Sequence, residues 1–350
     1  MKYFEYLNDE IIVFISFEKT VNSRTKTYFD GLIELGYICR WYEIRSKSIF
    51  RDIFRIVKNL NIRQCSFVVA SPSHLLVPYL FLITRKMPFF DLGWPLVDGV
   101  ITSRKNYGVL RINLIKTIFI DSISIIFSRI VFVESHYQLD RLNKVFFFCK
   151  EKFVLLPTGF NESRFGKKIA GLYDPLRRVI LFRGGDLPEA GIDVLISAIR
   201  MNTNKSIRFI IISRSIRLKD LNLPNTEVFT DYLTDEEVGK LYASASVVLG
   251  QLSSHKRTNW TIPHKFYEAA YLGIPYITSN SAPMIEFENI NSVKLFNGGD
   301  ALDLIKTIDR LVNNSNEMEI LSSNIYQLYN KNFNQQLLSK FFLSYINKYK

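Results

Sequence analysis

Residues suited to metal binding and cross-linking are scarce in this 350-residue chain. It has three cysteines, Cys39, Cys65 and Cys149, and four histidines that form no ligand-like cluster. There is neither a Cys-x-x-Cys pair nor an Asp-x-Asp pair. An odd, widely spaced set of cysteines argues against a disulfide framework and favours a reducing compartment. The sequence therefore predicts no metal site.

The sequence also lacks the signals of secretion and membrane insertion. The acids Asp9 and Glu10 near the start argue against a secretory signal peptide. Residues 64–84 contain no Lys, Arg, Asp or Glu, and this stretch is long enough to suggest a transmembrane helix. However, residues 71–74 (Ser-Pro-Ser-His) break this stretch, so a strand, a polar loop and a helix fit it better. We expect a cytoplasmic protein.

Length and periodicity predict two α/β domains. A chain of 350 residues exceeds one typical core, and strand-like runs alternate with amphipathic helical runs throughout. We expect an N-terminal Rossmann-like domain over residues 1–165 and a second one over 175–333. The boundary falls in residues 161–174, which have charges and no clear period. The last segment, 334–350, is expected to be a helix that packs back on the first domain.

Positive charge is concentrated in the first half of the chain. Residues 1–170 hold 25 basic and 15 acidic residues, whereas 171–350 hold 20 and 18. A basic half indicates a polyanionic partner. Basic residues beside apolar helix positions favour an anionic membrane surface, with a simply solvated surface as the alternative. No nucleic-acid module is visible, so nucleic acid is not expected. The basic residues concerned are Arg51, Arg55, Lys58, Arg63, Arg85, Lys86, Arg104, Lys105, Arg111 and Lys116.

The most informative segment is residues 260–278, WTIPHKFYEAAYLGIPYIT. Pro263 suits the first turn of a helix, and Thr261 can cap it. Gly273 ends this helix, and Pro275 prevents its continuation. The segment therefore predicts a helix followed at once by a strand.

Two charged residues lie three positions apart on this predicted helix. A helix N-terminus with a nearby Lys265 suits a diphosphate, and Glu268 one turn later can accept hydrogen bonds from ribose hydroxyls. The alternative is a surface helix on which Lys265 and Glu268 form a weak exposed ion pair. The buried face would consist of Phe266, Ala269, Ala270 and Gly273.

This segment resembles the family 4 glycosyltransferases of the GT-B fold, the glycosyl transferases group 1, in their Pro-x-Lys-x-x-Glu-Ala-x-x-x-Gly-x-Pro version. Residues 231–249 and 281–286 are similar to the family's segments before and after it, the latter as a loop with a glutamate. The resemblance implies two Rossmann-like domains with parallel sheets facing across a cleft. It also implies Glu268 on the donor ribose, Lys265 on the donor diphosphate, and a metal-independent reaction that retains anomeric configuration. Thr261 is included among the donor-binding residues.

The loop before the second half's first helix departs from the family pattern. Residues 181–191 resemble the family's GRLxxEKG loop, but Gly185 takes the place of the phosphate-binding Arg and Ala190 that of the Lys. We predict that Arg183 serves instead, beside Gly184 and Gly185. The alternative is a tight glycine turn without a ligand. Trp260 takes the position of a second glutamate.

The first half resembles the family less specifically. Residues 154–165 look like the segment that ends the family's first domain, and 131–135 look like the strand and serine before it. In relatives, the loop after the strand predicted at 88–92 carries a His or Asp that activates the acceptor. Here Asp91 and Asp98 are the acids present, and Asp91 is preferred.

Each acceptor-side candidate has a structural alternative. Either aspartate could be a helix cap or a turn acid, because Asp98-Gly99 is a common turn pair. His74 and His136 are weaker candidates that could simply begin helices.

The sequence thus predicts a retaining, metal-independent glycosyltransferase of cell-surface polysaccharide synthesis. Its donor would be a UDP- or GDP-sugar that serves as substrate, with no cofactor, and its acceptor a glycan, expected to be lipid-linked. The predicted location is the inner face of the membrane, to which the protein would attach peripherally. The alternative is a noncatalytic GT-B-like binding or scaffold subunit, which the residues at 185, 190 and 260 favour.

Overall fold

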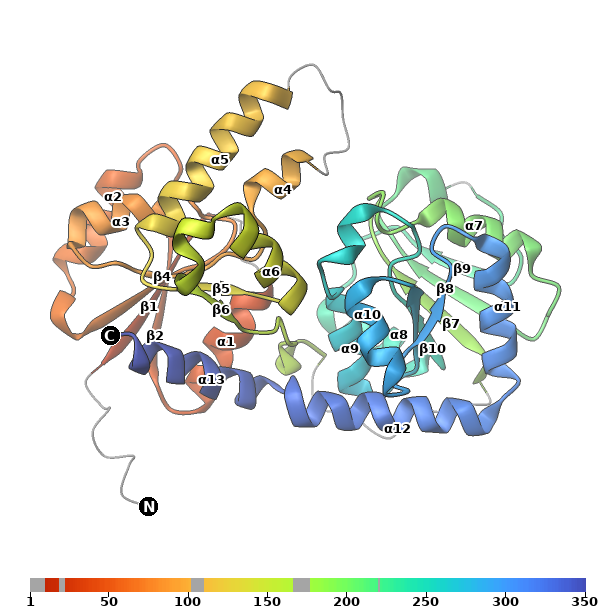
Figure 1. Cartoon of the computed structure of the whole chain (residues 1–350). Coiled ribbons are helices and arrows are strands. Elements are labelled where there is room, and N and C mark those ends of the chain that lie inside the picture. The colour runs from red at the N-terminus through yellow and green to blue at the C-terminus, as the bar shows by residue number, and fades with distance from the viewer. Residues whose placement is uncertain (1–9, 19–22, 102–109, 166–176, 220) are drawn as a thin grey trace. The chain divides into compact units, whose positions relative to one another are not determined.

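The computed structural model describes residues 10–18, 23–101, 110–165, 177–219 and 221–350. The chain forms two compact units, Met1–Asn161 with Gln335–Lys350, and Glu162–Asn334 (Figure 1). Each unit contains one six-stranded sheet, and the strand pairs are parallel. The predicted α/β class with parallel sheets is confirmed. The expected boundary at 161–174 falls largely on residues 166–176, outside the described residues.

The sheet of the first unit has the order β2-β1-β3-β4-β5-β6. Apart from the edge strand β2, which contains Arg40 and Glu43, its strands are mostly apolar runs, as expected where helices cover both faces of a parallel sheet. Strand order reverses between β1 and β3, which is where such sheets bind ligands. The strands are β1 (Ile11–Phe17), β2 (Ile38–Ile44), β3 (Cys65–Val69), β4 (Phe89–Asp91), β5 (Val131–Val133) and β6 (Phe153–Leu155).

Helices cover both faces of this first sheet. One face packs against α2, α3, α5 and α6, whose buried side chains share one core cluster. The other packs against α1 and the last helix, α13, which lie side by side (Figure 1). The helices are α1 (Ser23–Glu34), α2 (Ile49–Lys58), α3 (Leu76–Thr84), α4 (Leu96–Ile101), α5 (Leu110–Ile126), α6 (His136–Val145) and α13 (Gln335–Lys348), with short 3₁₀ turns η1 (Ile62–Gln64) and η2 (Phe147–Lys152).

The sheet of the second unit has the order β12-β11-β10-β7-β8-β9. Its first strand, β7, lies between β8 and β10, so the strand order reverses between β7 and β10. This reversal marks the expected ligand position at the carboxyl ends of the strands. The strands are β7 (Val179–Arg183), β8 (Arg208–Ile212), β9 (Thr226–Phe229), β10 (Val247–Leu249), β11 (Tyr276–Ser279) and β12 (Lys294–Phe296).

Side chains cap the start of some helices of the second unit. Thr234 and Glu237 form a reciprocal capping box at α8, and the Asp300 side chain caps α11. The helices are α7 (Ile192–Met201), α8 (Asp235–Ser244), α9 (His264–Leu272), α10 (Ala282–Asn289), α11 (Ala301–Val312) and α12 (Ser315–Asn332), with 3₁₀ turns η3 (Glu162–Phe165), η5 (Ile216–Leu218) and η6 (Lys256–Asn259).

Two local predictions around α9 were wrong. Pro263, not Thr261, occupies the N-cap position, and the Thr261 hydroxyl donates to the Arg257 carbonyl oxygen at 3.3 Å. Residues 281–286, expected as a loop, begin α10, because Ser281 is its N-cap and Pro283 suits the first turn. The predicted end of α9 is confirmed, since Gly273 adopts a left-handed φ of 69°.

Residues 64–84 form β3, a loop and α3, as the sequence predicts. None of the helices in the described part of the chain has the length and hydrophobicity needed to span a membrane.

Candidate functional site

The second unit gathers charged side chains where its strand order reverses. Arg183 is the last residue of β7, and Gly250 directly follows the neighbouring β10. The Lys265 ammonium, near the start of α9, donates to the Gly250 carbonyl oxygen at 2.9 Å. The strand ends and α9 therefore bring Arg183 and Lys265 to the expected ligand position.

Lys265 is partly buried and lies over an aromatic ring. Its Nζ is 4.4 Å from the centroid of the Phe182 ring. Burial lowers the pKa of Lys265 to about 7; Glu268 raises it and Arg183 lowers it further. The ammonium thus sits in a place where an anionic ligand would favour its charged form.

Glu268 is a buried anion with several donors around it. Arg183 donates to Oε1 at 2.6 Å, the Tyr242 hydroxyl donates to Oε2 at 2.6 Å, and His264 Nδ1 is 3.3 Å from Oε1. Burial alone would raise the pKa of Glu268, but Arg183, His264 and Tyr242 hold it well below its usual range. The exposed Lys265–Glu268 pair considered as an alternative is therefore wrong, because α9 is buried from Phe266 to Leu272.

Arg164, in η3, extends this ionic cluster. Its guanidinium donates to both carboxylate oxygens of Asp235 at 3.0 and 2.6 Å and lies 3.9 Å from the Glu268 carboxylate. Hydrogen bonding to Asp235 and the negative charges of Glu268 and Asp235 raise the pKa of Arg164, so it stays charged. Phe165 beside it packs on Gly239, where an added Cβ would approach the phenylalanine to 3.0 Å.

The two predicted glycines differ in their surroundings. The Gly184 N–H donates to the Ile212 carbonyl oxygen at 3.0 Å, and a Cβ there would lie 2.7 Å from the Phe182 ring. Gly185 is exposed, and the turn comes later, at residues 188–190. Gly184 therefore has a packing role, and Gly185 leaves open space after β7.

Sequence reasoning missed a second arginine–glutamate pair beside this site. Arg257, in η6, donates to the Glu189 carboxylate at 3.0 Å, and Glu189 is buried. Glu189 lies within the GRLxxEKG-like segment, but nothing in the local pattern of Arg257 marked it. The two residues are 68 positions apart, so only the fold brings them together.

In the first unit, Asp91 ends β4 and is completely buried. Arg24 Nε donates to one carboxylate oxygen at 2.7 Å, and the Thr25 hydroxyl donates to the other at 2.6 Å. Arg24 also donates to the Thr158 hydroxyl at 3.2 Å, which in turn donates to Glu134 at 3.1 Å. Asp91 thus anchors a buried network at the strand ends, a role the sequence did not indicate.

Asp98 is also engaged in an ion pair. Arg141 of α6 donates to one of its oxygens through Nε at 2.9 Å and through a second N–H. Asp98 lies in α4 with 2% of its surface exposed. The structure therefore places both predicted acids in bonds to arginines and does not bring them together.

His74 lies near a buried acid that the sequence did not single out. Its Nε2 is 3.5 Å from Asp121 Oδ1, and both side chains are buried. Burial lowers the pKa of His74 to about 4 and raises that of Asp121 to about 7, although Asp121 accepts N–H groups of Leu96 and Val97. His136 is the exposed first residue of α6, as its structural alternative predicted.

The described residues contain no cluster of three or more His, Cys, Asp or Glu side chains able to hold a metal ion. The charged groups at the end of the second sheet include three cations, Lys265, Arg183 and Arg257, of which the two arginines are paired with Glu268 and Glu189. Such a set can neutralise a ligand with several negative charges.

Comparison with known proteins agrees with this geometry. Residues 171–328 match the family Glycosyl transferases group 1. No curated protein matches the chain in sequence. Solved structures with the same fold include sucrose-phosphate synthase from Thermosynechococcus elongatus (TM-score 0.73, 13% identity, 97% of this chain and 98% of that one). They also include HepE from Anabaena in complex with UDP-glucose (TM-score 0.67, 12% identity, 97% and 99%), and a glycosyltransferase from Rickettsia africae (TM-score 0.68, 13% identity, 97% and 98%).

The order of strands, the charged set at the strand reversal and the family match lead to one assignment. Residues 171–328 match the glycosyl transferases group 1 family, and the chain as a whole has the GT-B fold of the glycosyltransferase structures it resembles.

Proposed function

We propose that the chain is a metal-independent, retaining glycosyltransferase that moves a sugar from a UDP- or GDP-sugar to a glycan acceptor, without a cofactor. The observation that carries this is Lys265, held at the reversal of strand order with its ammonium on the Gly250 carbonyl. A cation there can neutralise the diphosphate that leaves as the sugar is transferred. HepE from Anabaena, similar in fold, is described in complex with UDP-glucose.

The test is a panel of nucleotide sugars incubated with glycan acceptors. We expect thermal stabilisation by one UDP- or GDP-sugar and slow transfer of its sugar with the donor's anomeric configuration, read by NMR. Activity should persist in EDTA, because the cations replace a metal at the diphosphate. Loss of activity in EDTA with rescue by Mg²⁺ or Mn²⁺ would contradict the metal-independent part. Binding without turnover would favour the noncatalytic scaffold.

Donor binding is expected to depend on pH through Lys265. In the free protein its pKa is about 7, and Glu268, Arg183 and Glu189 are the charged groups that act on it. A bound diphosphate favours the ammonium, so binding above pH 7 takes up a proton. The phosphates of UDP-glucose do not titrate above pH 7. Its Kd should therefore rise by up to about tenfold per pH unit, until the pH reaches the pKa that Lys265 has in the complex.

Isothermal titration at pH 6, 7, 8 and 9 measures this effect. Below pH 7 the ammonium is already formed, so Lys265 should add no further pH dependence. Lys265→Arg, which stays charged, serves as the control and should flatten the profile. An unchanged wild-type Kd between pH 7 and 9 would show that Lys265 takes up no proton when the donor binds.

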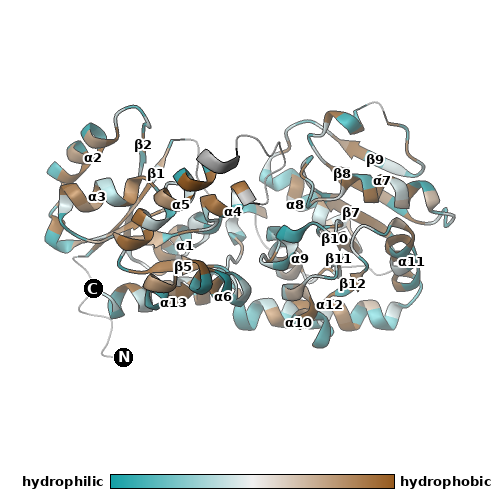
Figure 2. Ribbon diagram, turned by 45° about the horizontal axis from the view of Figure 1, so that its top comes forward, coloured by the Kyte–Doolittle hydropathy of each residue, from teal (hydrophilic) through white to brown (hydrophobic). Residues whose placement is uncertain are grey.

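We further propose that the acceptor is lipid-linked, that the protein attaches to the inner face of the membrane, and that it acts in cell-surface polysaccharide synthesis. The support is the outer surface of the layer α2, α3, α5 and η2, which we call the amphipathic layer. Many of its exposed side chains are large and apolar, and α5 is mostly hydrophobic in colour (Figure 2). They are Phe50, Phe54, Tyr79, Leu82, Ile115, Ile118, Phe119, Ile126, Phe147 and Phe148.

Basic residues accompany these apolar ones. Arg51, Arg55 and Lys58 are exposed on α2 beside Phe50 and Phe54. Exposed apolar groups beside cations are typical of surfaces that lie in the headgroup region of anionic bilayers. Arg104 and Lys105, also singled out in the sequence, lie outside the described residues.

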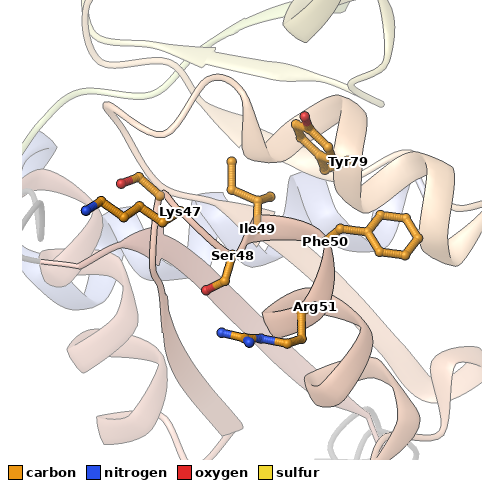
Figure 3. Close-up of a pocket in the computed structure, with 7 residues that line it drawn as sticks. Lys47, Ser48, Ile49, Phe50, Arg51 and Tyr79 are labelled. Carbon is orange, nitrogen blue, oxygen red and sulfur yellow. The ribbon is translucent and has the colours of Figure 1, made fainter.

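The amphipathic layer also contains a hollow suited to a headgroup. Six residues around the start of α2, Ser46–Arg51, and Tyr79 of α3 line a groove of about 460 Å³ (Figure 3). Lys47 and Arg51 contribute cations to it, and Phe50 and Tyr79 contribute aromatic rings. This combination suits a phosphate with an attached acyl region and supports the membrane part of the proposal.

A further inference from the structure

His74 and Asp121 face one another inside the first unit. His74 Nε2 is 3.5 Å from Asp121 Oδ1, with 1% of the histidine side chain exposed and none of the aspartate. Backbone groups of Pro72 and Trp94 lie near the ring, but neither ring nitrogen forms a well-directed hydrogen bond to any described residue. Because buried polar groups normally have a partner, the neighbouring carboxyl is the group that can supply one.

Three elements meet at this pair. His74 lies in the loop between β3 and α3, and its carbonyl oxygen accepts from the Ser124 hydroxyl of α5 at 2.9 Å. Asp121, one turn earlier on α5, accepts the N–H groups of Leu96 and Val97 at 3.1 and 2.9 Å. These two N–H groups belong to the start of α4. The pair therefore joins the loop after β3 to the segment that follows β4.

The surroundings of Asp121 do not favour a charge. Asp98 of α4 raises the pKa of Asp121, and Arg141 of α6 is engaged with Asp98 through two N–H groups. The neighbouring residues Leu76 and Val77 of α3 are buried and apolar. Among the described residues, His74 is the one basic side chain within ion-pair distance of Asp121.

Neutral forms of both residues avoid two buried charges. An isolated carboxylate and an isolated imidazolium are each costly to bury, and an ion pair offsets that cost only with good geometry and further hydrogen bonds. Burial lowers the pKa of His74 to about 4 and raises that of Asp121 to about 7. Between these values the two residues hold one proton together, and it lies on the carboxyl.

We propose that His74 and Asp121 form a neutral pair with one shared proton, kept on the Asp121 carboxyl and directed at His74 Nε2, and that this pair positions the start of α4. Folding between about pH 4 and 6.5 then moves one proton, because an N–H bond of the imidazolium breaks and an O–H bond forms on the carboxyl. The consequence for sugar transfer rests on the proposed function, since the segment after β4 is the expected acceptor side. Both are positioning residues.

Asp121→Asn is expected to change how folding depends on pH. Folded Asp121 keeps its proton up to about pH 7, whereas an unfolded aspartate loses it near about pH 4, so its stabilising effect falls as the pH rises between these values. Asparagine removes this loss. Relative to the wild type, the folding equilibrium constant of the variant should rise by about tenfold per pH unit from pH 5 to 7.

Urea unfolding across this range measures the ratio. The exposed acid Asp140 of α6 supplies the matched control, since Asp140→Asn should give a flat ratio. An equally flat ratio for Asp121→Asn would show that Asp121 is an ordinary ionised carboxylate and would overturn the neutral pair.

His74→Gln should give the opposite slope. Folded His74 stays neutral down to about pH 4, whereas an unfolded histidine takes up a proton below about pH 6.5, so its contribution to stability rises with pH. Without it, the folding constant relative to the wild type should fall by up to about tenfold per pH unit from pH 5 to 6.5. His136→Gln, exposed at the start of α6, is the control and should be flat. A flat or rising ratio for His74→Gln would contradict a neutral buried imidazole.

The imidazole resonances of the wild type give a test that leaves the pair unchanged. Nitrogen-15 chemical shifts should show a neutral His74 from pH 5 to 8, with one step near pH 7 where Asp121 loses the shared proton. The chain has four histidines, so the signal is assigned by substituting the other three, as His136→Gln, His255→Gln and His264→Gln. A charged His74 at pH 6, or no step near pH 7, would overturn the proposal even if the pair variants fail to fold.

The positioning role is measured by kinetics with the donor and acceptor found in the panel. At pH 6, Asp121→Asn should raise the acceptor KM by less than about threefold, because its amide can still accept one N–H of α4 and donate to His74. Asp121→Leu, which can do neither, should raise the acceptor KM by about tenfold or more and leave the donor KM unchanged. Equal acceptor KM values for the leucine variant and the wild type would overturn the positioning role.

Failure of the pair and failure of the proposed function give different results. Opposite pH slopes for the two variants, with no sugar transfer by the wild type, would support the pair and contradict the proposed function. Sugar transfer by the wild type, with flat ratios for both variants, would overturn the pair and leave the proposed function standing.

Discussion

Replacing Lys265 by methionine is expected to lower kcat/KM for sugar transfer by at least a hundredfold while the protein stays folded. The diphosphate gains negative charge as the bond to the sugar breaks, so a fixed ammonium stabilises the transition state more than the ground state. Removing one such electrostatic contact typically costs about 3–4 kcal/mol in activation free energy, or a factor of 10² to 10³. Steady-state kinetics with the donor found in the panel measure the effect.

Lys265→Met is also expected to change how the free energy of unfolding depends on pH. Because the pKa of Lys265 is about 7 in the folded state and higher in the unfolded chain, the unfolded state binds more protons between about pH 7 and 10. The contribution of Lys265 to the free energy of unfolding therefore rises with pH across this window. Relative to the wild type, Lys265→Met should be most stable below pH 7, and the difference should shrink towards pH 10.

Urea unfolding at pH 6 and pH 9 measures this difference. Lys240→Met is the control, because Lys240 is exposed on α8 and pairs with Glu236 at 2.8 Å. It should change neither activity nor the pH dependence of stability by much. Transfer activity within threefold of the wild type in Lys265→Met would show that another group neutralises the diphosphate.

Reversing three charges on α2 is expected to abolish binding to anionic vesicles. Each basic residue near an anionic surface contributes about 1 kcal/mol, so losing Arg51, Arg55 and Lys58 should weaken binding by about a hundredfold. Replacement by glutamate adds repulsion to this loss. Co-sedimentation with vesicles containing anionic lipid, compared with neutral vesicles and across a salt series, measures the effect.

The control variant also replaces three basic residues by glutamate, but at other positions. Lys331→Glu, Lys340→Glu and Lys348→Glu change three exposed lysines on α12 and α13, which are not part of the amphipathic layer. Vesicle binding should survive in the control, and donor binding should survive in both variants. A wild-type protein that ignores anionic vesicles at low salt would remove the support for a lipid-linked acceptor.

The repeating elements of this fold could be predicted because they carry a local signal. Apolar runs such as Cys65–Val69 are buried in full, and the helix before Gly273 has both its period and its left-handed end in the sequence. The short turn η6 could not be predicted, since four residues carry no period. Residues 281–286 were expected to be a loop because they resemble the family's loop at this place, whereas they begin α10, where a proline in the first helical turn is tolerated.

The sequence predicted site residues that lie on one helix or strand, but not their partners on other elements. Lys265 and Glu268 were found through their spacing on α9, but their partners come from β7, β10 and α8. Arg24 and Asp91 are 67 positions apart, so the sequence showed an acid at a strand end and not the arginine that holds it. Burial decides whether an acid faces a ligand or a neighbour, and it depends on packing between distant segments.

The position of the last helix determines how the chain can be truncated. α13 follows the second unit in the chain but completes the hydrophobic core of the first, where Leu338, Phe342 and Ile346 are fully buried. A stop codon before Gln335 would spare every residue of the donor half and still open the core of the other half. A minimal first unit must therefore be expressed as residues 1–161 joined to 335–350, in the manner of a host domain from which an insert has been removed.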